Sequence, residues 1–159
     1  MISLKIVYGD IFDHVENNKA DVLVHGCNCL CNMGAGIALT IKNKYPEAYE
    51  VDLQTEKGAS SKLGTYTKVN INRSDKSFTI VNAYTQYNWN GNGVLADYDA
   101  IRQAFRAIKK DFSGLRIVYP LIGSGLAKGN WQIIKSIIDE ELKGEMHYCV
   151  KLLAEKKPV

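Results

Sequence analysis

One stretch of sequence decides the fold of this chain: Asp21-Val-Leu-Val-His-Gly-Cys-Asn28-Cys-Leu-Cys-Asn-Met33-Gly-Ala-Gly36-Ile-Ala38. An apolar run, Val22 to His25, is typical of a buried parallel strand, and a helix is predicted to begin at Gly36. Glycine allows the intervening loop to approach a ligand closely, and a helix N-terminus offers unpaired N–H groups at a positive dipole end. This stretch therefore predicts a site for a phosphate or diphosphate.

A second stretch repeats this arrangement later in the chain. The apolar run Leu115 to Pro120 leads into a glycine-containing loop, Leu121 to Gly129, and a helix is predicted over Asn130 to Leu142. Ligands of open α/β sheets bind beyond the carboxyl ends of the strands, so two such loops can enclose a diphosphate. Glycines also serve ordinary tight turns, which is the alternative for each loop taken alone. The G-x-x-x-x-G-K-[ST] and G-x-G-x-x-G motifs are absent, which argues against a P-loop ATPase or kinase.

The rest of the chain alternates between strand and helix patterns. Further strands are predicted over Ser3–Tyr8, Leu63–Asn70, Ser77–Tyr84 and His147–Leu153, and the middle two pair as a hairpin around the polar turn 72–76. Helices are predicted over Glu47–Glu56 and Asp99–Lys110, with a helix or turn over Ile11–Asn18; the Gly36 helix ends at Lys44, before Tyr45-Pro46. This order predicts a three-layer α/β/α sandwich with a mixed central sheet. We expect one domain, residues 1–159.

The composition is that of an ordinary globular protein, with 159 residues, 46% hydrophobic and 23% charged. A net charge of +3 with no basic–aromatic stripe argues against nucleic acid as a partner. The basic residues near the end of the chain are expected to form a solvated tail; they are Lys143, Lys151, Lys156 and Lys157.

Cysteine spacing and the absence of targeting patterns in the sequence indicate the cellular compartment of the protein. Cys27, Cys29 and Cys31 lack the two-residue gaps common in zinc sites, so with Cys149 we expect reduced thiols and no metal. The sequence has no signal-peptide pattern and no apolar run long enough to span a membrane. We expect a cytoplasmic monomer without a cofactor.

Four motifs in the expected order resemble those of one family. They are Tyr8-Gly9-Asp10-Ile11, Val24-His25-Gly26-Cys27-Asn28, Met33-Gly34-Ala35-Gly36-Ile37-Ala38 and Pro120-Leu121-Ile122-Gly123-Ser124-Gly125-Leu126. Together they resemble the macrodomains, which are ADP-ribose-binding α/β modules, and the resemblance covers nearly the whole chain. The third motif resembles one branch in particular, which includes the terminal ADP-ribose glycohydrolase of animals and the yeast-type ADP-ribose 1''-phosphate phosphatases.

The resemblance implies roles for residues at both ends of ADP-ribose. Asp10 would accept the exocyclic amine of adenine, and Ile11 would add its backbone N–H and apolar packing. Asn28 would hold the distal ribose, because an amide both donates and accepts hydrogen bonds. The structural alternatives are a helix cap for Asp10 and a loop-stabilising Asx turn for Asn28.

The resemblance also implies that the two loops hold the diphosphate through backbone N–H groups. The implied residues are Met33, Gly34, Gly36 and Ile37 from the first loop, and Ile122, Gly123, Ser124, Gly125 and Leu126 from the second. Ser124 would add a hydroxyl group. Such donors are set before binding and cost little to reorganise.

Aromatic residues follow the strand that ends at Tyr84. Tyr84 is a candidate wall for adenine or ribose; the alternative for it and for Trp89 is hydrophobic cover of the hairpin edge. The segment Gln86 to Asp97 is long and polar, and is either a flap over the site or an exposed loop.

The sequence departs from the lysine–carboxylate chemistry of the glycohydrolase branch. No lysine lies between Tyr84 and Asp97, and Ala127 stands where the second loop of that branch carries an aspartate. Hydrolysis of ADP-ribose 1''-phosphate needs fewer catalytic side chains, because a water must only be oriented near a phosphate that is already held. His25 and Asp97 are candidates for acid–base work or water positioning, with Asn28 orienting the sugar. The alternatives are a buried structural histidine and a helix cap.

Three functions remain open. The first is hydrolysis of ADP-ribose 1''-phosphate. The second is recognition of free or terminal ADP-ribose without turnover, and the third is removal of ADP-ribose from acidic side chains of an ADP-ribosylated protein.

Overall fold

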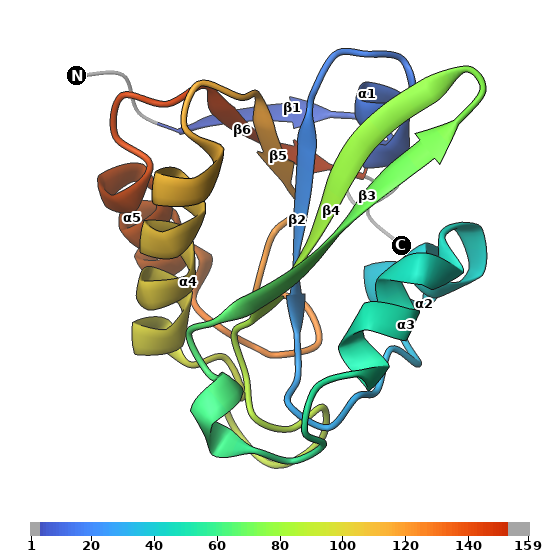
Figure 1. Ribbon diagram of the computed structural model, residues 1–159. Coiled ribbons are helices and arrows are strands. Elements are labelled where there is room, and N and C mark those ends of the chain that lie inside the picture. The colour runs from blue at the N-terminus through green and yellow to red at the C-terminus, as the bar shows by residue number, and fades with distance from the viewer. Residues whose placement is uncertain (1–3, 153–159) are drawn as a thin grey trace, which may run out of the picture.

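The computed structural model describes residues 4–152, which form a six-stranded sheet between two layers of helices (Figure 1). The strand order is β1-β6-β5-β2-β4-β3. The strands are β1 (Lys5–Tyr8), β2 (Val22–Cys27), β3 (Tyr66–Arg73), β4 (Lys76–Tyr84), β5 (Ile117–Tyr119) and β6 (His147–Lys151). Neighbouring strands are parallel except β3 and β4, which are antiparallel. The predicted three-layer sandwich with a mixed sheet is confirmed.

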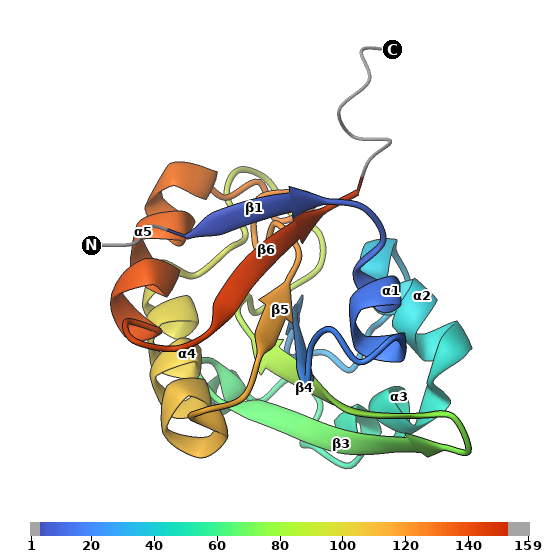
Figure 2. The same cartoon turned by 90° about the horizontal axis from the view of Figure 1, so that it is seen from above.

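Helices α1, α2 and α3 cover one face of the sheet, and α4 and α5 cover the other (Figure 2). Their bounds are α1 Ile11–Glu16, α2 Gly36–Lys44, α3 Pro46–Leu53, α4 Tyr98–Phe112 and α5 Trp131–Glu141. The side chains of Asp10, Asp97 and Asn130 cap α1, α4 and α5 by accepting backbone N–H groups. No helix within residues 4–152 has both the length and the apolar character needed to cross a membrane.

The central strand β2 sends side chains to both layers because successive residues of a strand point to opposite faces. Val22 and Val24 pack with α4 and α5, whereas Leu23 packs with α1, α2 and α3. This strand is therefore buried on both faces, and its carboxyl end points at the loop that the sequence singled out.

The β3–β4 hairpin differs from its predicted bounds. Its first strand begins at Tyr66 rather than Leu63, because residues Ser60–Lys62 form a 3₁₀ turn. The ladder continues past Asn70 because Ile71 is buried opposite Phe78, and only residues 74–75 separate the strands. The other elements match to within a few residues, and Ser3 and Leu153 lie outside the described residues.

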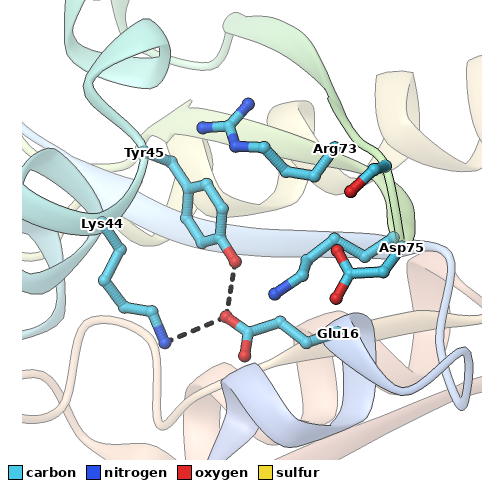
Figure 3. A pocket seen from close by; sticks show the side chains of 7 residues that line it. Glu16, Lys44, Tyr45, Arg73 and Asp75 are labelled. Carbon is cyan, nitrogen blue, oxygen red and sulfur yellow. Dashed lines mark hydrogen bonds and ion pairs between the residues drawn. The ribbon is translucent and has the colours of Figure 1, made fainter.

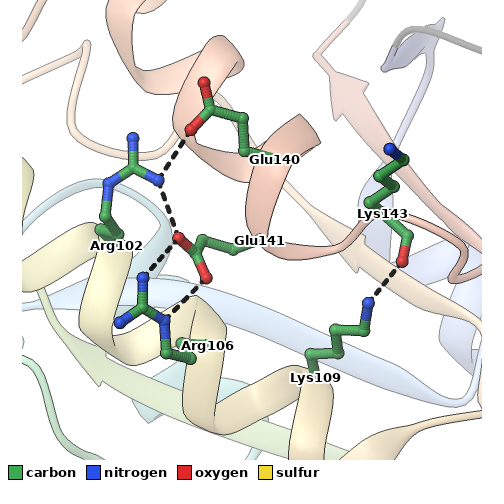
Figure 4. Close-up of polar contacts among 6 residues, drawn as sticks. All are labelled: Arg102, Arg106, Lys109, Glu140, Glu141 and Lys143. Atoms are coloured by element: carbon green, nitrogen blue, oxygen red, sulfur yellow. Dashed lines mark hydrogen bonds and ion pairs between the residues drawn. The ribbon is translucent and has the colours of Figure 1, made fainter. Parts of the chain in front are cut away.

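Ion pairs link the two helices on the second face of the sheet (Figure 4). Arg102 contacts Glu140 at 2.8 Å and Glu141 at 2.7 Å, and Arg106 contacts the same Glu141 at 3.0 Å. Hydrogen bonds from Arg106 and then from Arg102 hold the pKa of Glu141 below its usual value. Glu141 is thus the shared acceptor that connects α4 to α5.

Candidate functional site

A cleft of about 730 Å³ lies at the carboxyl ends of the central strands. This volume lies within the range of small-molecule sites. Four segments line it: the stretch from the end of β2 to the start of α2, the β5–α5 loop, the start of the β4–α4 loop, and the end of β6. The lining residues are Gly26, Cys27, Asn28, Asn32, Gly34–Ala38, Gln86, Trp89, Pro120–Ala127 and Lys151. The two glycine loops therefore meet at one cavity, as predicted from their place after parallel strands.

The first loop ends in a helix N-terminus that is open to the cleft. Gly36 has a φ of +58°, which is a conformation that favours glycine. The N-cap residue Ala35 offers no side-chain cap, and the first bond into the helix runs from the N–H of Leu39 to the carbonyl of Ala35. The N–H groups of Gly36, Ile37 and Ala38 form no hydrogen bond with residues 4–152, so they are available to an anion.

The second loop offers a matching set of donors. Gly123 has a φ of +74°, and a Cβ there would lie 3.0 Å from Ile134 Cδ1 in the core. Within the described chain, the N–H groups of Gly123, Gly125 and Leu126 have no partner. Both the N–H and the hydroxyl of Ser124 donate to the carbonyl of Leu121, at 3.2 and 3.0 Å. The second loop thus presents free N–H groups mainly at its glycines and at Leu126.

Asn28 lines the cleft, but its side chain is engaged in shaping the loop. Its Oδ1 accepts from the N–H of Leu30 at 2.9 Å, and its Nδ2 donates to the carbonyl of Asn32 at 2.8 Å. The carbonyl Oδ1 of Asn32 in turn accepts from the N–H of Gly34 at 3.1 Å. In this structure Asn28 therefore forms the Asx turn that was the alternative to ribose contact.

Three residues that the resemblance assigns to ligand binding lie outside the lining. The exposed Asp10 caps α1 by accepting the N–H of Phe12 at 2.9 Å. Ile11 and Met33 are buried in the core beneath α1, α2 and α3, because both side chains are apolar and face that layer. The structure does not bring these three side chains to the cleft.

Tyr84 does not form a wall of the cleft, contrary to its proposed role. Its ring is buried, and its hydroxyl donates to Asp52 Oδ1 at 2.7 Å. The ammonium of Lys62 lies over the ring, 4.7 Å from its centroid. Burial raises the pKa values of both Tyr84 and Asp52. This polar group supports the first loop from behind, since Lys62 Nζ also donates to the carbonyl of Cys29.

His25, which was proposed as a catalytic residue, is fully buried and does not line the cleft. Its Nε2 lies 2.6 Å from Asn82 Oδ1 on the neighbouring strand β4. Cys27 Sγ lies 3.5 and 3.7 Å from the two ring nitrogens. Cys, His and Asn are also the residue types of a cysteine nucleophile system, which requires a reactive thiolate. Burial lowers the pKa of His25 to about 4 and raises that of Cys27 well above its usual value. Both groups are therefore neutral at pH 7, and Cys27 is not an activated thiolate.

Asp97 is the N-cap of α4 and also lies outside the lining. Its carboxylate accepts the N–H of Ala100 at 3.0 Å, and its own N–H donates to the carbonyl of Thr85 at 2.8 Å. These contacts are those of a helix cap, which was the alternative to a catalytic role for Asp97. Within residues 4–152, no carboxylate or imidazole lines the cleft.

Several lining residues were not among the predicted site residues, and three of them lie outside the two glycine loops and β2. Gln86 and Trp89 lie in the segment that was predicted as a flap or an exposed loop, and Trp89 is half-exposed in the wall. Lys151 was expected in a solvated tail, but it ends β6 and lines the cleft. The sequence places Lys151 in the last predicted strand. It does not show that this strand pairs with β5, whose following loop lines the cleft.

The four cysteines are free and buried. Among the residues that the structure describes, no group of three or more His, Cys, Asp or Glu side chains is placed to hold a metal ion. Cys31 Sγ instead donates to the carbonyl of Asp52 at 3.3 Å, and Cys29 Sγ lies 3.6 Å from the carbonyl of Gln86. These thiols pack the first loop against its surroundings.

A second hollow of about 550 Å³ lies between α1, α2 and the tip of the β3–β4 hairpin (Figure 3). Three of its charged residues, Glu16, Lys44 and Arg73, form ion pairs within the protein. Glu16 accepts hydrogen bonds from Tyr45 and from Lys44, the latter at 2.9 Å, and Arg73 pairs with Glu47 at 2.6 Å. Compensated surface charges of this kind offer little to a ligand, so the cleft at the carboxyl ends of the strands is the functional candidate.

Comparison with known proteins agrees with this fold. The sequence profile of the Macro domain family matches residues 24–138. The chain therefore belongs to the macrodomain family.

Among similar sequences, an uncharacterised 17.5 kDa protein of enterobacteria phage T4 is 34% identical over 143 residues, covering 86% of this chain and 88% of that protein. An ADP-ribose 1''-phosphate phosphatase of Meyerozyma guilliermondii is 31% identical over 48% of this chain and 44% of its own length. A DNA ADP-ribosyl glycohydrolase of Mycobacterium tuberculosis is 26% identical over 72% of this chain and 33% of its own length. The chain thus spans less than half of each of these two named enzymes.

A solved structure, Thermosipho africanus DarTG in complex with ADP-ribose, superposes with a TM-score of 0.72 at 19% identity. The superposition covers 98% of this chain and 43% of that one. At this identity the likeness concerns the fold.

Proposed function

We propose that the protein binds ADP-ribose in the cleft and hydrolyses ADP-ribose 1''-phosphate to ADP-ribose and phosphate. The observation that carries this proposal is the pair of loops with free N–H groups on both sides of one cavity: Gly36, Ile37 and Ala38 on one side, Gly123, Gly125 and Leu126 on the other. Backbone donors held in place stabilise phosphate charge without reorganisation, and the α2 dipole adds to them. The likeness to the fungal ADP-ribose 1''-phosphate phosphatase supports the same ligand class.

The chemistry of the lining restricts the mechanism. In the described part of the chain, no carboxylate or imidazole reaches the cleft, so no side chain there is suited to act as a general base at neutral pH. In the proposed reaction water attacks the phosphorus, the bond from phosphorus to the C1'' oxygen breaks, and that oxygen takes up a proton from the phosphate group. The phosphate oxygens themselves accept the proton of the attacking water. The protein contributes positioning of the ester and stabilisation of its charge.

The second candidate is recognition of ADP-ribose without turnover. The same absence of acid–base side chains from the lining favours it. Removal of ADP-ribose from a macromolecule is a third candidate, supported by the 72% of this chain that aligns with the mycobacterial DNA ADP-ribosyl glycohydrolase. The lack of a lysine between Tyr84 and Asp97 argues against a covalent lysine–carboxylate route for this reaction.

Two measurements test the proposal. Titration calorimetry with ADP-ribose tests binding, and phosphate release from ADP-ribose 1''-phosphate tests turnover. Binding with phosphate release above a no-protein control supports the phosphatase, and binding without release excludes it and leaves the other two candidates. Absence of ADP-ribose binding would overturn all three candidates.

A matched pair of variants locates the binding to the cleft. A Cβ at Gly125 would meet no atom within 4 Å, and the backbone there is not in the left-handed region, so substitution is compatible with the fold. Gly125→Glu places a carboxylate beside the diphosphate and should weaken ADP-ribose binding at least about tenfold through like-charge repulsion. Gly125→Gln has the same size without the charge and should bind more tightly than Gly125→Glu. Equal affinities of the two variants would contradict the location.

A further inference from the structure

Lys151 is the charged residue of the cleft. Among the lining residues of the described chain, it alone carries a formal charge. Its ammonium forms no hydrogen bond or ion pair with any residue from 4 to 152. Lysines on this protein's surface can pair internally, as Lys44 does with Glu16 at 2.9 Å. An unpaired cation at a binding cavity is available to an anionic ligand.

The strand register places Lys151 beside the second glycine loop. β6 lies between β1 and β5, and Tyr119 of β5 pairs with Cys149 of β6. Two residues further along these parallel strands, Lys151 follows Cys149 and Leu121 follows Tyr119. Cys149 belongs to the core on the α4 and α5 side, and side chains alternate along a strand, so Lys151 shares that side with Cys149. Ile122 and Ala127 of the β5–α5 loop belong to the same core cluster as Cys149 and line the cleft.

The order of strands also places Lys151 at one end of the cleft. Its backbone carbonyl accepts the N–H of Gly9 at 2.9 Å, so it adjoins the end of β1 and the residue Asp10 that follows. Gln86 and Trp89 come from the segment after β4, on the far side of β2. An elongated ligand with its diphosphate between the glycine loops therefore has one end near β6 and β1 and the other near Trp89.

We propose that the Lys151 ammonium pairs with the diphosphate of the ligand and makes the cleft selective for an anionic nucleotide. The proposal rests on the proposed ADP-ribose binding. The diphosphate carries two negative charges, whereas the loops and the α2 N-terminus offer only partial charges. Lys151 supplies the one full positive charge that the described lining holds. It is thus a specificity-determining residue and takes no part in bond breaking.

The test compares Lys151→Met and Lys151→Arg with wild type by titration calorimetry. The ligands are ADP-ribose, ADP and adenosine, of which ADP keeps the diphosphate and adenosine keeps no phosphate. At about 20 mM salt, Lys151→Met should weaken the binding of ADP-ribose and of ADP each by about tenfold, and this loss should shrink at about 0.5 M salt through screening. Adenosine binding should not change, and Lys151→Arg should retain most of the wild-type affinity.

Lys143→Met is the matched control, because it removes the same charge from the chain. Lys143 is exposed and precedes β6, so it lies toward the amino end of the strand that Lys151 ends. The control should bind ADP-ribose as wild type does. Thermal unfolding of each variant checks that the fold is retained.

The outcomes separate the two proposals. If wild type fails to bind ADP-ribose, the proposed function fails and this inference falls with it. If wild type binds and Lys151→Met binds equally well, only the inference is overturned. Loss of ADP-ribose affinity without loss of ADP affinity, or an equal loss for adenosine, would also overturn the assignment to the diphosphate.

Discussion

Burial of His25 makes the stability of this protein depend on pH in a defined window. The imidazole is fully buried and its pKa is about 4, whereas an unfolded histidine has a pKa of 6.5. Below pH 6.5 the unfolded chain takes up a proton that the folded protein does not. The free energy of unfolding therefore falls as the pH drops from 6.5 towards 4, and this contribution is fully present only above pH 6.5.

The size of the effect follows from the two pKa values. A difference from 6.5 to about 4 corresponds to a total loss of about 3 kcal/mol, of which about 2 kcal/mol is already lost at about pH 5. His25→Gln removes the titrating group and keeps an amide donor for Asn82 Oδ1, which the imidazole Nε2 approaches to 2.6 Å. The variant should therefore lose less stability than wild type between about pH 7.5 and about pH 5, by about 2 kcal/mol.

Urea unfolding at the two pH values measures this difference. Other groups with shifted pKa values, such as Glu141, titrate in both proteins and cancel in the comparison. His14→Gln is the control, because this imidazole is less buried and burial lowers its pKa less. Equal pH dependence of wild type and His25→Gln, or an equal effect of His14→Gln, would refute the reasoning.

Three further predictions concern the cleft and the helices that flank it. Gly26→Ala places a Cβ 2.7 Å from the buried Thr85 Oγ1, so urea unfolding should show a loss of about 1–3 kcal/mol; an unchanged midpoint would contradict this clash. ADP-ribose should change the emission of Trp89, which lines the cleft, and Trp89→Phe should abolish the change; a signal that persists would assign it to Trp131. Glu141→Gln should lower the free energy of unfolding by about 1 kcal/mol by weakening the α4–α5 ion pairs, and an effect that does not diminish at high salt would contradict this cause.

The sequence predicts the fold well because its signals are local. The glycine loop after Val22–His25 and the cap residues Asp97 and Asn130 act within a few residues of where they stand. Apolar periodicity of 3.6 or 2 residues marks each helix and strand. The hairpin bounds were the exception, because burial of Ile71 opposite Phe78 extends the ladder through residues that look like a polar turn.

The side chains of the site were harder to predict because burial and partners decide their roles. His25 and Tyr84 are polar residues next to functional motifs, yet Asn82 and Asp52 engage them inside the protein. Asp97 satisfies a helix N-terminus. The partners of His25 and Tyr84 come from segments that are distant in sequence, and Asp97 can serve either as a helix cap or in catalysis. Only the tertiary packing determines whether such a residue has a structural or a functional role.

By itself, the sequence determined that two glycine loops follow two buried strands, because backbone conformation and strand burial are local consequences of residue type. Only the tertiary structure decided which side chains these loops meet. His25, Tyr84 and Asp97 lie outside the cleft lining in the structure. Lys151, which the sequence places in a basic tail, lines the cleft. The physical reason is that parallel strands bring their carboxyl ends together regardless of their order in the chain, so the end of β6 lies beside the loop after β5.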